Sequence, residues 1–247
     1  MVDLSGKWVL ITGASRGIGR LIANFLADQG CNMILHARTK EATKDLLNEV
    51  LAKGVSAFSV YAELSDLNEV EEMLQKIDRS GAQVDVVLNN AGLQIAYRTE
   101  YLTTPDEDYE KSFLINTIAP MKICYHFLPQ MIERGFGRIV NTTSGIALEA
   151  EQAGYSASKA ALNKVTIDLG YKVNGTDVIM SLADPGWCRT DLGGPNAPNA
   201  PESAIPGIVV GAFINDKKSG RIFGAQDFKG MTLEEAVAKA ESYAAPY

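Results

Sequence analysis

A tyrosine and a lysine stand four residues apart in the stretch YSASK, residues 155–159. Residues at i and i+4 share one face of a helix, so the Lys159 ammonium is expected near the Tyr155 phenol. Tyrosine has a pKa of about 10, and a nearby positive charge lowers that pKa. Such a pair could protonate the alkoxide that forms when hydride reduces a ketone. An exposed Tyr–Lys pair on a helix surface is the ordinary alternative.

A second stretch has the composition of a phosphate-binding turn. TGASRGIG (12–19) follows a predicted strand and opens a predicted helix. Gly13, Gly17 and Gly19 allow a tight turn, so a pyrophosphate can approach the amides at the helix N-terminus. A glycine turn that only packs a helix against a strand is the alternative. The position between strand and helix favours dinucleotide binding.

The end of the second predicted strand indicates which dinucleotide is preferred. NAD-binding sites usually carry an acid about 20 residues beyond the glycines, where it holds the ribose hydroxyls. Here LHARTK places Ala37 at that point and Arg38 next, and Arg16 lies inside the glycine loop. Two guanidinium groups without a carboxylate suit a 2′-phosphate. We therefore expect NADP(H), with NAD(H) as the alternative if Arg38 only ends a strand at the surface.

The elements that must position these residues alternate along the chain. Apolar runs predict strands at 7–13, 32–38, 55–64, 84–92, 137–144, 177–186 and 220–224. Helix-period segments are at 18–30, 41–54, 67–81, from the TTPDED stretch to about Gly135, and at about 152–174. Thr232 and Glu235 form a capping-box pattern that starts a last helix. A surface helix without a role in catalysis is expected, and docking on the body of the domain or on a neighbouring subunit is the alternative. Apolar strands that alternate with helices predict one doubly wound α/β domain with a parallel sheet.

Composition narrows the classes of function. The chain has 247 residues, 46% of them hydrophobic, which is enough for one domain with a substantial core. Its net charge of −7 disfavours nucleic acid and anionic membranes as partners. Three widely spaced cysteines and two histidines make a metal site or a disulfide framework improbable. Neither a signal sequence nor a membrane-length apolar run is found, so a cytoplasmic location is expected.

The motifs together resemble those of the short-chain dehydrogenase/reductase family. TGASRGIG, NNAG (89–92), Asn116, Ser144 in IVNTTS, YSASK and DPGWCRT occur in that family's order, over about residues 6–192. The resemblance implies a single Rossmann-type domain over 1–247, with helices on both faces of the sheet. Residues 1–135 would mainly bind the dinucleotide, and 136–247 would carry catalysis and substrate. The stretch after DPGWCRTDLGGP is similar to the small carbonyl-reductase branch.

The resemblance also assigns roles to single residues. Tyr155 is the proton donor, and Lys159 also binds the nicotinamide ribose. Ser144 hydrogen-bonds the substrate oxygen, and Asn116 holds a water beside the lysine. Pro120, one turn after Asn116, removes a backbone donor and should distort the helix. The implied cofactor-binding residues are Gly13, Ser15, Arg16, Gly17, Ile18, Gly19, Arg38, Glu63, Leu64, Asn90, Ala91, Gly92, Tyr155, Lys159, Pro185, Gly186 and Thr190.

Two features depart from the family's pattern. Glu63 stands where the adenine-side acid is usually aspartate, and only 11 positions separate Ser144 from Tyr155. The loop between these two must be compact, so substrate contacts of relatives are not carried over. The proline-rich segment 192–207 is expected to be a substrate lid. Candidate pocket walls are Ile146, Gln152, Trp187 and Leu192, with a core position for Trp187 as the alternative.

Three functions remain open at this stage. An NADPH-dependent carbonyl reductase acting on a small molecule is favoured. An NAD-dependent alcohol, hydroxysteroid or polyol dehydrogenase of the same family is the second. A catalytically silent dinucleotide-sensing protein is the third, and the intact set of Asn116, Ser144, Tyr155 and Lys159 counts against it. The resemblance implies a homodimer or a homotetramer, with a monomer as the alternative, since some carbonyl reductases of the family are monomers.

Overall fold

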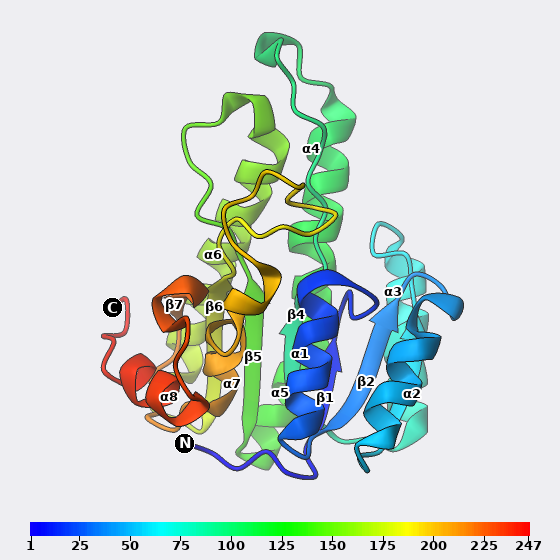
Figure 1. Cartoon of the computed structure of the whole chain (residues 1–247), viewed down its shortest axis with the longest axis vertical. Coiled ribbons are helices and arrows are strands. Elements are labelled where there is room, and N and C mark those ends of the chain that lie inside the picture. Colours follow the sequence, from blue (N-terminus) through cyan, green and yellow to red (C-terminus); the bar gives the residue numbers. More distant parts are fainter.

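The computed structural model describes every residue from Met1 to Tyr247, and a seven-stranded sheet runs through its centre (Figure 1). The strands are β1 (Trp8–Ile11), β2 (Asn32–Ala37), β3 (Ala57–Tyr61), β4 (Val84–Asn89), β5 (Gly137–Thr142), β6 (Val178–Asp184) and β7 (Arg221–Gly224). All neighbours pair in parallel, in the order β3-β2-β1-β4-β5-β6-β7. The order reverses between β1 and β4, and in open α/β sheets such a switch point is where ligands bind, at the carboxyl ends of the strands. The predicted doubly wound parallel sheet is confirmed.

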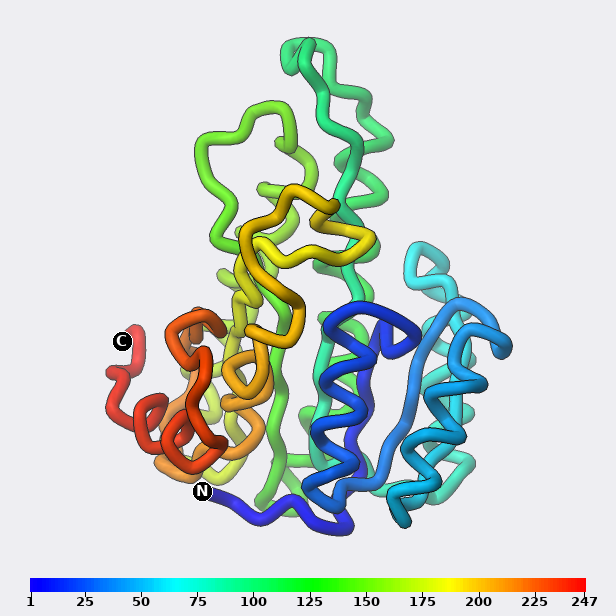
Figure 2. The backbone as a smooth tube through the Cα atoms, viewed as in Figure 1, coloured from blue at the N-terminus to red at the C-terminus, as the bar shows by residue number.

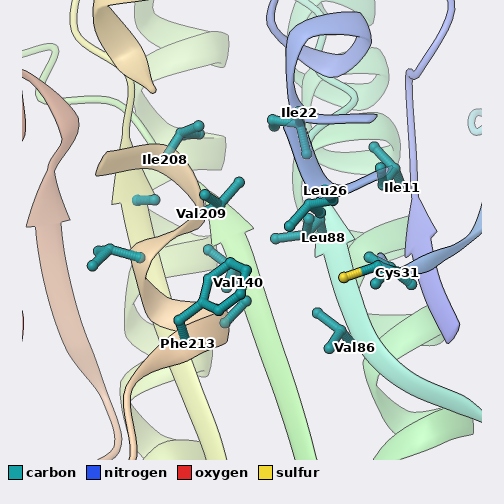
Figure 3. Close-up of a cluster of buried hydrophobic side chains, with 14 of the residues drawn as sticks. Ile11, Ile22, Leu26, Cys31, Val86, Leu88, Val140, Ile208, Val209 and Phe213 are labelled. Carbon is teal, nitrogen blue, oxygen red and sulfur yellow. The ribbon is translucent and has the colours of Figure 1, made fainter. Parts of the chain in front are cut away.

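Helices cover both faces of the sheet. They are α1 (Gly17–Asp28), α2 (Lys44–Ala52), α3 (Leu67–Ser80), α4 (Asp106–Phe113), α5 (Ala119–Arg134), α6 (Ala153–Val173), α7 (Val210–Phe213) and α8 (Leu233–Glu241). One core of 33 buried residues packs α1, α2, α7 and α8 on the first face, and Figure 3 shows part of it. A second core of 24 buried residues packs α3, α5 and α6 on the other face. No helix is long and apolar enough to span a bilayer.

Local signals set where the helices begin and end. The Asp66 carboxylate caps α3 by accepting the amide of Asn68 at 2.8 Å. Gly81 ends the same helix in the left-handed region, with φ of 74°. The capping box predicted for the last helix is confirmed, because Thr232 and Glu235 exchange hydrogen bonds of 3.2 and 2.8 Å at the start of α8. One face of α8 is buried in the first core, so this helix docks on the body of the domain.

The helical stretch that carries Asn116 is interrupted as expected. A π-helical turn, Leu114–Ile118, joins α4 to α5 directly before Pro120. In a regular α-helix the carbonyl of Asn116 would accept the amide of residue 120, and proline has no N–H to donate. Insertions of this kind are frequent at functional sites. The distortion that Pro120 predicts is therefore present, and it lies at the asparagine of the motif.

The segments that follow β4, β5 and β6 rise on one side, beyond the carboxyl ends of the strands (Figure 2). The third of them contains the predicted lid, 192–207. Its last part is packed: Ala204 is fully buried in the first core, and a short 3-10 helix, Pro201–Ala204, contacts α1. The apolar run 208–214, which no predicted element covers, forms a 3-10 turn and α7 in the same core. The lid stays a prediction, restricted to the part before Pro201.

Candidate active site

Helix α6 places Tyr155 and Lys159 inside the protein, not on its surface. Tyr155 is 7% exposed and Lys159 is 4% exposed. The Lys159 Nζ donates to the carbonyl of Thr142, the last residue of β5, at 2.7 Å. A Cβ built on Gly92, after β4, would lie 3.6 Å from this Nζ and 3.5 Å from Asn116 Oδ1. The ends of β4 and β5, the π-turn and α6 therefore meet at one point.

The charge states of the pair differ from the sequence-based expectation. Burial raises the pKa of Tyr155 above its ordinary value, and the Asp184 carboxylate raises it further, while the Ser144 hydroxyl acts to lower it. Burial also lowers the pKa of Lys159 to about 8, and Asp184 opposes that shift. The net shift of the phenol pKa in the free protein is therefore upward, because desolvation is its largest cause, and the lowering of this pKa by Lys159 stays a prediction. Tyr155 is held in its protonated form.

Ser144 and Asp184 line the same spot from β5 and β6. The Ser144 Oγ accepts the amide of Ile146 at 3.2 Å, which fixes the start of the loop toward Tyr155. A Cβ on Gly145 would lie 2.8 Å from Asp184 Oδ2, so the carboxylate lies directly against this loop. Its other oxygen accepts the amide of Gly186 at 2.9 Å. Asp184 is thus a charged group of the site that the sequence analysis did not name.

Asn116 is fully buried and uses its side chain as a clamp. Its Oδ1 accepts the amide of Leu93 at 2.8 Å, and its Nδ2 donates to the Leu93 carbonyl at 2.8 Å. The same Nδ2 donates to Ser158 Oγ at 3.0 Å, and that hydroxyl donates to the Tyr155 carbonyl at 2.7 Å. The asparagine therefore ties the chain after β4 to the helix that carries Tyr155. The water-holding role that the resemblance implies stays a prediction.

The glycine turn and the NNAG turn are packed on each other at the switch point of the sheet. A Cβ on Gly13 would come within 2.9 Å of Ala91 Cα, and one on Gly19 would overlap the Gly13 carbonyl oxygen. Asn90 Nδ2 donates to the carbonyl of Thr12 at 3.2 Å, and Thr12 Oγ1 accepts the amide of Ala91 at 3.0 Å. Side chains are excluded here, which leaves the backbone amides at the start of α1 available to phosphate oxygens.

The remaining cofactor candidates surround this cradle. Arg16 pairs with Asp191 at 3.0 Å, and a Cβ on Gly17 would lie 3.4 Å from Thr190, so the loop after β6 touches the glycine turn. Arg38 is exposed at the end of β2, and no ion pair holds it. Ser15 and Ile18 are half-buried in the turn, whereas Leu64 is buried. The Glu63 carboxylate accepts the amide of Ser65 at 3.2 Å, and the Pro185 carbonyl accepts Gln226 Nε2 at 2.8 Å.

The four candidate pocket walls are not equivalent. Gln152 is 4% exposed and donates to the Ile95 carbonyl at 3.1 Å, so it lies beneath the surface, with its Oε1 unpartnered. Ile146 is half-buried beside Ser144. Trp187 is 59% exposed with its Nε1 donating to the Gly193 carbonyl at 2.7 Å, which rules out the core position. Leu192 is 46% exposed.

Three supporting residues escaped the sequence analysis, namely Thr12, Ser158 and Asp184. Thr12 precedes Gly13 inside the quoted motif, and Ser158 lies inside YSASK. Other residues of these motifs had the recognisable roles, so the sequence did not show that Thr12 accepts the Ala91 amide or that Ser158 accepts Asn116 Nδ2. Asp184 opens the quoted stretch DPGWCRT. An acidic residue at a strand end, next to a proline and a glycine, was the available signal.

The arrangement agrees with comparisons to known proteins. A family model described as short chain dehydrogenase matches residues 7–200. The ketoacyl reductase HetN of Nostoc sp. is 33% identical over 192 residues, which are 76% of this chain and 65% of the relative. A fatty acyl-CoA reductase of Acinetobacter baylyi is 33% identical over 187 residues, 73% of this chain and 63% of the relative. The matches span slightly less than two thirds of these relatives' own lengths.

Solved structures similar to this chain are also short-chain dehydrogenases or reductases. A metagenomic short-chain oxidoreductase in complex with NADP has a TM-score of 0.69 and 32% identity, and the match covers 75% of this chain and 84% of that one. A short-chain type dehydrogenase/reductase from Mycobacterium marinum has a TM-score of 0.77 at 23% identity, covering 90% and 94% of the two chains. The second likeness concerns the fold alone.

Proposed function

The chain belongs to the short-chain dehydrogenase family, and we propose that it reduces the carbonyl group of a small molecule with NADPH. The observation that carries the proposal is the buried ammonium of Lys159. Burying a charge without a counter-charge is costly and needs a compensating role. Its one hydrogen bond, to the Thr142 carbonyl, leaves two N–H donors free. These donors face Gly92 and suit the hydroxyls of a cofactor ribose.

The residues present fit a bound dinucleotide. The turn formed by Gly13, Gly19 and Ala91 has no room for side chains, so a pyrophosphate could approach the amides at the start of α1. Arg38 and Arg16 supply guanidinium groups for a 2′-phosphate, although Arg16 must then leave Asp191. The NADP bound by the metagenomic relative supports the same preference. When bound, NADPH supplies the hydride.

The chain's own residues then bind the substrate oxygen and deliver the proton. The hydroxyls of Ser144 and Tyr155 hold the carbonyl oxygen between β5 and α6. As that oxygen gains negative charge, the phenol O–H of Tyr155 breaks and a new O–H forms on the product alcohol. A raised phenol pKa does not prevent this step, because an alkoxide is far more basic than a tyrosinate. The Lys159 ammonium then faces the tyrosinate and favours it electrostatically, until a proton returns from solvent.

The substrate is proposed at the level of a carbonyl compound. The ketoacyl reductase and the fatty acyl-CoA reductase support acyl-chain carbonyls as the first compounds to test. The rim of the site adds apolar side chains, since Trp187 and Leu192 are exposed and Leu148 is completely so. An NAD-dependent alcohol, hydroxysteroid or polyol dehydrogenase is the alternative within the family, and cofactor preference separates it from the reductase.

We also propose a cytoplasmic enzyme that forms a homodimer or homotetramer. Three exposed apolar residues, the last residue of the π-turn and two residues of α5, follow at intervals of seven: Ile118, Tyr125 and Ile132, which are 41, 57 and 54% exposed. Such a stripe lies on one face of the helix and suits packing against a second helix. Light scattering tests the assembly, and a monomer at micromolar concentration would contradict it.

The decisive experiment combines a substrate panel with one variant. Purified protein is mixed with ketones, 3-oxoesters and acyl thioesters, and the loss of NADPH or NADH absorbance is followed. We expect turnover with NADPH. Tyr155→Phe should lower turnover at least a thousandfold, in line with removal of a general acid, while NADPH still binds in a fluorescence titration. Near-normal reduction by Tyr155→Phe, or no turnover of any carbonyl by the unchanged protein, contradicts the proposal.

A further inference from the structure

The glycine turn is held from below by a buried histidine. His36, the fifth residue of β2, is 2% exposed. Its Nδ1 accepts the amide of Gly13 at 3.2 Å, and its main-chain carbonyl accepts the amide of Ala14 at 2.9 Å. Two consecutive amides of the turn therefore end on one residue of the neighbouring strand. The other ring nitrogen, Nε2, lies 3.0 Å from the Ala62 carbonyl after β3.

These partners leave the ring one chemical form. A backbone amide can only donate, so Nδ1 must be an unprotonated acceptor. A backbone carbonyl can only accept, so Nε2 must carry the proton. The neutral Nε2–H tautomer satisfies both contacts, whereas an imidazolium would place an N–H against the N–H of Gly13. Burial acts in the same direction, since it lowers the pKa of His36.

The turn that His36 supports has no freedom on its other side. Gly13 adopts φ of 67°, and Ala91 packs where its Cβ would be. The Gly13 amide is thus fixed between the NNAG turn and the His36 ring. We propose that His36 is a positioning residue that holds the glycine turn in the shape that binds the dinucleotide. The inference rests on the proposed function only in taking the turn as the cofactor site.

The charged neighbours of His36 are few. The Glu63 carboxylate, after β3, acts on the ring through space and favours its protonated form. Glu69 of α3 accepts the Glu63 amide at 2.7 Å and so lies behind it. Arg16 on the glycine turn and Arg38 at the end of β2 are the cations of the elements that meet at the ring. Protonation of His36 is therefore opposed by burial and by the Gly13 amide, and it is aided by the Ala62 carbonyl and then by the Glu63 carboxylate.

Three replacements separate positioning from simple filling of space. His36→Asn keeps a side-chain acceptor near the Nδ1 position but loses the bond to Ala62. His36→Gln keeps a donor near the Nε2 position but loses the acceptor for Gly13. His36→Leu keeps volume and loses both. We expect the Kd for NADPH at pH 7.5 to stay within about threefold for His36→Asn and to rise about tenfold or more for the other two, because each leaves the Gly13 amide unpaired.

Two measurements are independent of turnover. The dissociation constant is measured by calorimetry with NADP⁺ at pH 5.5 to 8, and thermal unfolding checks that each variant is folded. The wild type should lose affinity relative to His36→Asn only at a pH below the ordinary histidine pKa of about 6.5, because burial lowers the pKa of His36. The cofactor's own phosphate also titrates in this range, but its effect is the same for both proteins and cancels when their dissociation constants are compared at each pH. His126→Asn, at the one other histidine, should behave as wild type.

Nitrogen-15 NMR of the ring gives the direct test. With two histidines in the chain, His126→Asn assigns the His36 signals, which should show the neutral Nε2–H tautomer at pH 7.5. A proton on Nδ1 would overturn the proposal, as would folded His36→Leu with wild-type affinity or a ranking in which His36→Gln binds better than His36→Asn. If the wild type binds neither NADP(H) nor NAD(H), the proposed function fails together with this inference. If the wild type binds the cofactor and the His36 variants bind it with the same affinity, this inference is refuted and the proposed function is not.

Discussion

Replacing Lys159 by methionine should make the free protein more stable while disabling it. The side chain is 4% exposed, and burial lowers the pKa of its ammonium from 10.5 to about 8. At about 1.4 kcal/mol per pKa unit, keeping the charge buried at pH 7 costs about 3 kcal/mol. Methionine removes this cost but leaves the Thr142 carbonyl without its donor, a loss of about 1–2 kcal/mol. We expect Lys159→Met to raise the free energy of unfolding at pH 7 by about 1–2 kcal/mol.

The difference in stability between Lys159→Met and the wild type should change sign as the pH rises. Because the folded pKa of Lys159 is below the unfolded value, the unfolded chain binds more protons between pH 8 and 10.5. The wild type therefore gains stability relative to the variant as the pH rises through this window. The advantage of Lys159→Met should be full below pH 8 and should disappear, then reverse by about 1 kcal/mol, near pH 10.5. Other titrating groups cancel in the difference.

Urea unfolding of both proteins at pH 7, 8.5 and 10 measures the effect, with a second lysine as a control. Lys164, five residues along α6, is 73% exposed and pairs with Asp168, so Lys164→Met should change stability by less than about 0.5 kcal/mol at every pH. NADPH titration should show weakened binding by Lys159→Met alone. A less stable Lys159→Met at pH 7, or a difference that does not vary with pH, would refute the cost assigned to the buried ammonium.

Two other substitutions test the cofactor preference and the charge of the site. Arg38→Asp should shift the ratio of NADPH to NADH affinity toward NADH by tenfold or more, because a guanidinium–phosphate contact is worth about 1.5–3 kcal/mol; an unchanged ratio would contradict the assignment. Asp184→Asn keeps an acceptor for the Gly186 amide but removes the charge that raises the pKa of Tyr155 and Lys159. The alkaline limb of kcat/KM against pH should therefore move to lower pH, and a limb that stays in place would refute the role of this carboxylate.

The elements of the fold are largely readable from the sequence, because each carries its own signal. Buried parallel strands appear as apolar runs, and Asp66, Gly81 and Thr232 mark helix ends with short-range hydrogen bonds. A distortion of the helix at Pro120 was predicted from its missing N–H, and the structure has a π-turn there. The run 208–214 escaped because a short apolar stretch without periodicity fits a strand or a buried helix equally well, and tertiary packing decides between them.

The site was harder to predict, since its properties depend on depth and on distant partners. Spacing alone places Lys159 one turn from Tyr155, but it does not show that both are desolvated. Burial reversed the expected shift of the phenol pKa. His36 is a clearer case, because its partners Gly13 and Ala62 are 23 and 26 positions away in the chain. From the sequence, a histidine within an apolar strand is expected to be an ordinary core residue. The positioning role proposed for His36 follows only from its contact with the Gly13 amide.

The cost of burying Lys159 and its proposed function have the same cause. An ion pair would stabilise the ammonium, and Asp184 is the carboxylate whose charge acts on it, yet no salt bridge joins the two. Asp184 instead accepts the Gly186 amide, which keeps its oxygen on the loop after β6. A direct pair would occupy donors that, in the proposed function, bind a ribose. The separation leaves Lys159 charged but incompletely bonded. Substitutions that relieve this strain should therefore weaken cofactor binding, because the unbonded donors account for both effects.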